Sequence, residues 1–150
     1  ALLAEFLGTL LLLAIVVGSG IMGERLAEGN IAVALLANAA ATAGGLYVLI
    51  VLLGPISGAH FNPVVTMTMR ANGERLPAPV PAYVAVQIVA AIAGVLVAHA
   101  MFGESLWQPG DQVRTGMAQW FSEGVATFGL LLAFNLLGDG LRDALDPRQV

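Results

Sequence analysis

Long apolar runs, separated by short polar connections, dominate this chain. Four of the runs are long enough to cross a bilayer, at residues 2–22, 31–53, 82–102 and about 117–137. Because a helix rises about 1.5 Å per residue, roughly 20 residues cover the hydrocarbon core of about 30 Å. The pattern therefore predicts an all-α membrane protein with four transmembrane helices.

The segment after the second run departs from this pattern. Gly54-Pro55 and then Gly58 are expected to break the helix, and a new helix is predicted to start at Asn62-Pro63. Asn is a favoured N-cap, and Pro suits the first helical position because its missing N–H would be unpaired there anyway. The apolar residues that follow are too few to span, so a re-entrant half-helix is predicted over 62–71. Irregular backbone at membrane depth is tolerated only where protein buries it or where it lines a watery cavity, which indicates a pore.

The composition supports membrane insertion and excludes several functions. Of the 150 residues, 58% are hydrophobic and only 11% are charged, whereas soluble domains have about 25% charged residues. The net charge of −4, with scattered Arg residues, gives no support for nucleic-acid binding. Cysteine is absent, and His60 and His99 stand on separate segments, so neither a metal nor another cofactor is expected. No catalytic set or nucleotide-binding loop is visible, so an enzyme is not expected.

The positions of the arginines set the expected orientation. Four of them fall on one side of the predicted spans and two on the other, which favours a cytoplasmic N-terminus. The first group is Arg70, Arg75, Arg142 and Arg148, and the second is Arg25 and Arg114. We expect a multi-pass protein of the cell membrane of a bacterium.

Small residues recur within the spans, as in Ala90-xxx-Gly94-xxx-Ala98, and this spacing favours a compact bundle.

A pair of polar residues recurs later in the chain with the same spacing, which indicates two repeats. Glu5 and Thr9 recur 118 positions later as Glu123 and Thr127, each pair near the start of an apolar run. Inverted repeats of membrane transporters leave such weak symmetry. We therefore expect a first repeat at 1–116 and the first span of a second, incomplete repeat at 117–150.

The most promising site residues lie around the half-helix. Asn62 could donate from its amide to a solute oxygen at the positive end of the helix, or it could be an ordinary N-cap. The carbonyls of Gly58, Ala59 and His60 could line a channel wall, or the segment could be a plain turn. His60 is expected to hold the loop through hydrogen bonds rather than to carry protons.

Two carboxylates, Glu5 and Glu123, lie within apolar spans, where charges are costly. They could bind protons or cations, accept hydrogen bonds from the N–H groups of re-entrant loops, or sit near the interface. Their matching positions favour bracing, because each repeat has one loop to hold. Tyr83 and Gln87 are weaker polar signals and are expected to be packing or interfacial groups.

Together these residues resemble the aquaporin and aquaglyceroporin family, also called the major intrinsic proteins. The resemblance covers almost the whole chain in order, and its most specific part is Ser57-Gly58-Ala59-His60-Phe61-Asn62-Pro63. It also includes Ala4-Glu5-Phe6-Leu7-Gly8-Thr9, then Tyr83, Gln87 and Gly94, then Glu123 and Thr127. The resemblance implies six spans, two half-helices that meet at the pore centre, and tetramers with one pore per subunit. It implies passage of water, glycerol or other small neutral solutes, and exclusion of protons.

Three features depart from the family pattern. Val64 replaces the usual Ala after Asn62-Pro63, which adds bulk where the half-helices should abut. Thr42 stands at the filter position of the second span, twenty residues before Asn62, where Phe or Trp is typical. A small Thr suggests a wider opening, suited to uncharged solutes larger than water. The second motif and the fifth and sixth spans are absent.

We therefore expect a passive channel for water or small neutral solutes. The alternative is a truncated, non-conducting membrane protein that associates with full-length subunits. A proton-coupled transporter that uses Glu5, Glu123 and His60 is a weaker alternative. The expected partners are membrane lipid and the solute, with a homotetramer for a full-length chain.

Overall fold

The computed structural model describes residues 1–108 and 115–129 and has two compact units, 1–108 and 109–150. The first unit holds four helices: α1 (Leu2–Leu26), α2 (Ile31–Ser57), α3 (Pro63–Ala71) and α4 (Val80–Phe102). Within the described part of the chain, α1, α2 and α4 are long and apolar enough to cross a membrane. In the second unit, residues 117–129 are helical, and the remainder of the predicted fourth span lies outside the described residues.

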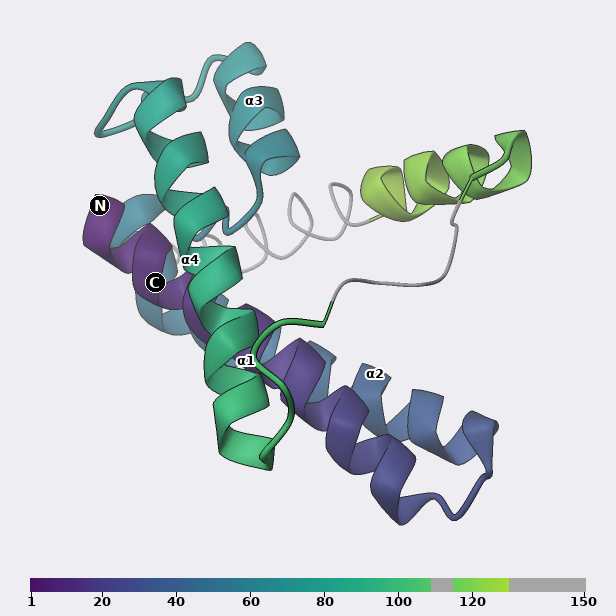
Figure 1. Cartoon of the computed structure of the whole chain (residues 1–150). Helices are drawn as coiled ribbons and strands as arrows, with labels where there is room; N and C mark the ends of the chain where they lie inside the picture. The colour runs from purple at the N-terminus through teal and green to yellow at the C-terminus, as the bar shows by residue number, and fades with distance from the viewer. Residues whose placement is uncertain (109–114, 130–150) are drawn as a thin grey trace, which may run out of the picture. The chain divides into compact units, whose positions relative to one another are not determined.

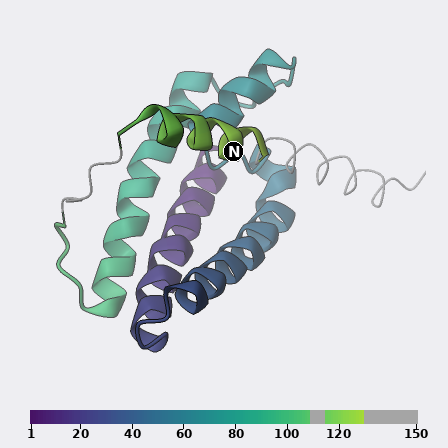
Figure 2. The ribbon, with the colours of Figure 1, turned by 90° about the vertical axis from the view of Figure 1, so that its right-hand side faces the viewer.

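Helix α1 is the central element of the first unit. It packs along α2 on one side and α4 on the other, and the short α3 contacts α4 (Figures 1 and 2). Glycines allow the long helices to approach closely. A Cβ at Gly94 of α4 would overlap the backbone carbonyl of Leu10 on α1, and one at Gly45 of α2 would lie 2.7 Å from Ile15 of α1. Ala90, Gly94 and Ala98 are all buried, as the small-residue spacing predicted.

The second helix ends later than predicted. Gly54 and Pro55 do not break α2, which continues to Ser57 with Pro55 inside its last turn. Proline removes one backbone hydrogen bond there, which the end of a helix tolerates more easily than its middle. The helix ends at Gly58, whose φ of 90° is left-handed and whose N–H donates to Gly54 O. Such a cap is typical of glycine, because a side chain strains that conformation.

The half-helix forms as predicted. Asn62 is the N-cap of α3, Pro63 is its first residue, and the helix ends at Ala71 after nine residues. Helix α4 begins at Val80, two residues before the predicted span 82–102, so Pro81 lies in its first turn. Proline fits there because the first N–H groups of a helix have no intrahelical partner.

Candidate functional site

The loop between α2 and α3 is buried within the bundle. Ala59, His60 and Phe61 are at most 4% exposed. Ala59 has a φ of 52° and Phe61 a φ of 50°, a left-handed conformation that costs a non-glycine residue energy. Strained backbone of this kind persists only where its surroundings hold it in place. The contacts of Glu5 provide that support.

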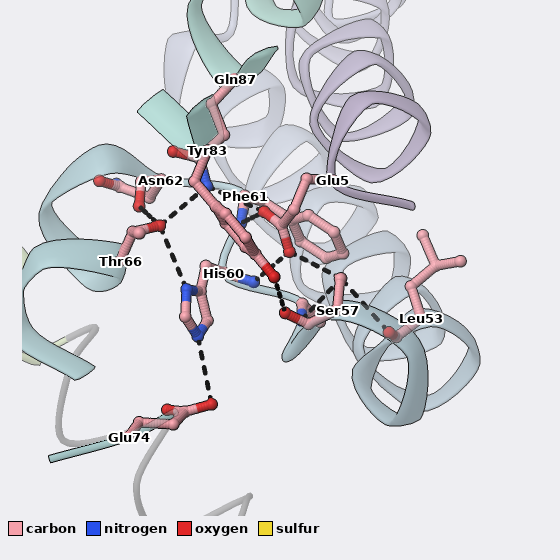
Figure 3. A network of polar contacts seen from close by, with 11 residues as sticks. Glu5, Leu53, Ser57, His60, Phe61, Asn62, Thr66, Glu74, Tyr83 and Gln87 are labelled. Atoms are coloured by element: carbon pink, nitrogen blue, oxygen red, sulfur yellow. Dashed lines mark hydrogen bonds and ion pairs between the residues drawn. The ribbon is translucent and has the colours of Figure 1, made fainter. Parts of the chain in front are cut away.

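Glu5 is fully buried and binds the loop through both carboxylate oxygens (Figure 3). Oε1 accepts hydrogen bonds from His60 N at 3.0 Å and Ser57 Oγ at 2.7 Å. Oε2 accepts from Phe61 N and from Gln87 Nε2, both at 2.8 Å. Consecutive N–H groups that converge on one anion form a backbone nest, which left-handed residues make possible. The four donors match the acceptor-only ionised form of the carboxyl.

The nest turns the loop N–H groups toward Glu5 and leaves the loop carbonyls unused. Ala59 N also donates inward, to Ser57 Oγ at 3.2 Å. No donor among the described residues reaches the carbonyls of Gly58, Ala59, His60 or Phe61. Of these four residues only Gly58 is exposed, so its carbonyl is the acceptor that water or a solute can reach in the described unit.

Thr66 joins the half-helix to the rest of this network. Its Oγ1 lies 3.1 Å from Asn62 O, 3.1 Å from His60 Nδ1 and 3.0 Å from Gln87 Nε2. A hydroxyl has one hydrogen to donate, and the carbonyl can only accept. Thr66 therefore donates to Asn62 O and accepts from the other two, which assigns the ring hydrogen to Nδ1 of His60. The ring's Nε2 lies 3.7 Å from Glu74.

Asn62 is held in one orientation. Its Oδ1 accepts from Val64 N at 2.8 Å, and because Val64 N is a donor, the amide oxygen must be the atom that faces it. The Nδ2 group is left pointing away, with no acceptor in the parts of the chain that the structure covers. The side chain of Val64, next in the motif, is partly exposed. Asn62 thus combines a capping oxygen with an uncommitted donor at a helix N-terminus.

The remaining predicted site residues belong to other segments of the chain. Thr42 is on α2, away from the loop, and its Oγ1 is buried with no partner among the described residues. Glu123 is on the helical residues 117–129 of the second unit, and its predicted bracing role stays a prediction.

Sequence reasoning undervalued two residues of α4. Gln87 and Tyr83 were expected to be packing or interfacial groups, but both are fully buried in the network. Gln87 binds Glu5 and Thr66, and Tyr83 Oη donates to Ser57 O at 2.9 Å. Their polarity within an apolar span was the available signal. What the sequence did not reveal is that α4 carries them to the same point as Glu5.

Comparisons with known proteins show the family of this chain. The family model described as "Major intrinsic protein" matches residues 1–144. The chain is 51% identical to "Aquaglyceroporin AqpS" of Rhizobium meliloti (strain 1021), over 85% of this chain and 54% of that protein. It is 34% identical to "Aquaporin-3" of Milnesium tardigradum, over 99% of this chain and 51% of the relative.

The chain spans about half the length of the curated relatives that it matches. No solved structure gives a significant match. The all-helical membrane bundle predicted from the sequence is confirmed, and the match is to a family of channels and not of enzymes. On the evidence of the family model and of these relatives, the chain belongs to the major intrinsic protein family.

Proposed function

We propose that this protein is a passive channel for water and small neutral solutes, and that residues 57–66 form one half of its pore wall. The observation that carries the proposal is the arrangement of hydrogen-bonding groups along the loop. Its N–H groups are committed to Glu5 and Ser57, and its carbonyls have no donor in the described residues. Such a wall offers acceptors to a solute that has left its hydration shell.

Asn62 would act at the narrow part of this path. Its free Nδ2 donates to the oxygen of a passing water or hydroxyl, and the N-terminus of α3 adds a partial positive charge. A cation is repelled by this charge, and a water bound through its oxygen cannot accept a proton from its neighbour at the same atom. We therefore propose that the channel excludes protons. Pro63 and Val64 would complete this part of the wall.

Glu5 and His60 would be bracing residues, because their polar atoms are used within the protein. Glu123 would brace the matching loop of a second repeat that begins at residue 117, after a first repeat at 1–116. The share of the relatives that the chain covers supports a second repeat. The bacterial relative supports placement in a bacterial cell membrane. We also propose a homotetramer, as the resemblance to the family implies.

Thr42 would set the width of the opening. The name of the relative that is 51% identical, an aquaglyceroporin, favours a solute larger than water.

The test uses the protein expressed from its complete reading frame and reconstituted in vesicles. Downhill flux of water and glycerol is expected, with no proton flux reported by a pH-sensitive dye. Thr42→Phe is expected to reduce glycerol flux far more than water flux. Flux that requires a pH gradient, or vesicles no more permeable than empty ones, would overturn the proposal.

A further inference from the structure

A second asparagine with a fixed orientation lies in the membrane-spanning part of α2. Asn38 is half-buried, seven residues after the start of the helix, among apolar neighbours. Its Nδ2 donates to Val16 O of α1 at 2.7 Å and to Ser19 Oγ at 3.0 Å. These two bonds use both hydrogens of the amide nitrogen.

The partners of Asn38 decide which way its amide points. Val16 O can only accept a hydrogen bond, so the nitrogen must face α1 and Oδ1 must face away from it. No donor in the described segments reaches Oδ1, and this atom keeps accessible surface, unlike the buried, unpartnered Oγ1 of Thr42. Asn38 therefore presents a fixed acceptor, whereas Asn62 presents a fixed donor.

The position of Asn38 relates this acceptor to the pore wall. Asn38 and Thr42 are four residues apart on one helix, so they are neighbours on the same face. An amide oxygen without a partner is costly against lipid, and polar groups inside spans face the bundle interior or a watery cavity. Helix α2 has only Leu49 and Ser57 buried in this unit, which leaves most of its surface available to line such a cavity.

We propose that Asn38 Oδ1 binds the hydroxyl groups of neutral polyols as they pass, on the same wall as Thr42. This inference rests on the proposed channel function and adds a solute-binding residue to it. A polyol hydroxyl both donates and accepts, so it can give its hydrogen to Asn38 and, further along the path, receive one from Asn62. Water permeability is expected to depend less on Asn38, because a small water molecule in a wide opening can form hydrogen bonds with other groups instead.

The test compares glycerol and water permeability in the same vesicle preparation, with the protein expressed from its complete reading frame. Asn38→Leu keeps the size of the side chain and removes the acceptor. It is expected to lower the ratio of glycerol to water permeability about fivefold, the factor that corresponds to one net hydrogen bond. Ser19→Ala is the matched control, because it removes a bracing partner of Asn38 and leaves Oδ1 in place. Its ratio is expected to match the wild type.

A second variant separates binding from folding. Asn38→Thr keeps a hydroxyl donor toward α1 and removes the amide oxygen, so it should lower the ratio as Asn38→Leu does. An unchanged ratio in both variants, or an equal change in Ser19→Ala, overturns the proposal. So does failure of both Asn38 variants to fold, as judged by circular dichroism and gel filtration, because Asn38 is then a structural brace. A wild-type protein that passes neither solute instead overturns the channel function itself.

Discussion

Gly8 on α1 lies directly against the aromatic ring of Phe61, one of the two strained left-handed residues of the loop. A Cβ at Gly8 would overlap the ring atoms Cε1, Cζ and Cδ1. Phe61 is 4% exposed and donates its N–H to Glu5. Glu5 lies on α1 about one turn before Gly8. The first helix thus holds this residue twice, by its backbone at Glu5 and by its ring at Gly8.

Gly8→Ala is expected to destabilise the protein by about 1–3 kcal/mol, because the ring must move within a packed core. The ring is coupled to the loop, so the solute flux proposed above should also fall. Gly44→Ala is the matched control, since a Cβ there has no neighbour within 4 Å. The control should be neutral or slightly stabilising, because Ala favours a helix interior. Thermal unfolding in detergent measures both, and equal melting temperatures would contradict the prediction.

Glu5→Gln tests the carboxylate nest. Glutamine has one acceptor oxygen, so its NH₂ group must face donors that Glu5 now satisfies, such as Phe61 N and Gln87 Nε2. Each buried donor left without a partner costs about 1–3 kcal/mol. We expect a loss of about 2–4 kcal/mol in unfolding free energy, together with faster hydrogen exchange at Phe61. Glu24→Gln, an exposed change on the same helix, should have little effect. A Glu5 variant as stable as this control would show that the nest does not hold the loop.

Asn62 can be divided into its two functions. Asn62→Ala removes the cap of α3 and is expected to cost about 1 kcal/mol. Asn62→Asp keeps an oxygen for Val64 N but replaces the free amide donor with a negative charge. The aspartate variant should therefore keep near-native stability and lose the exclusion of cations or protons. Ion-sensitive and pH-sensitive dyes in vesicles measure this change. Strict exclusion by a folded Asp variant would contradict the assigned role of the Nδ2 donor.

The sequence predicted those parts of the site whose evidence lies in neighbouring residues, and it missed those that depend on how the helices pack. The half-helix was predicted because its N-cap and first-turn proline are adjacent residues with known preferences. Glu5 was singled out because a carboxylate within an apolar run is unusual. Gln87 was given only a packing or interfacial role and Thr66 was given none, since their importance arises only when α4 and α3 meet beside Glu5. The predicted break at Gly54-Pro55 was wrong because Pro55 lies in the last turn of α2, where the loss of one backbone hydrogen bond does not end the helix earlier.

An ion pair joins the C-terminal ends of α1 and α4, through Arg25 in the last turn of α1 and Glu104 just after α4. Arg25 Nη2 lies 2.6 Å from Glu104 Oε1 and donates to Phe102 O at 2.9 Å. The hydrogen bond from Arg25 is the main cause that lowers the pKa of Glu104 below its ordinary value of 4.5, and Gln108 adds a smaller effect. A lowered folded pKa means that the contribution to stability is present above pH 4.5 and is lost as the pH falls through the folded value.

Glu104→Gln is therefore expected to reduce the melting temperature slightly at pH 7 and to leave it unchanged at a pH well below 4. The effect should be small and should weaken in high salt, because both partners are partly exposed. Glu28→Gln, in the connection after α1, is the matched control, because it also removes one carboxylate near the end of that helix. The same difference between Glu104→Gln and wild type at both pH values would contradict the prediction.

The distance along the chain between Glu5 and Gln87 has a consequence for biogenesis. Glu5 is translated 82 residues before Gln87, the one of its four donors that α4 supplies. Until that helix is inserted, a ribosome-bound chain holds an anion within the membrane whose hydrogen bonding is incomplete. The loop, with its left-handed residues, has the same incomplete support during that interval. The hydrogen bonds that hold the loop are therefore complete only once α4, the last of these four helices, packs against α1.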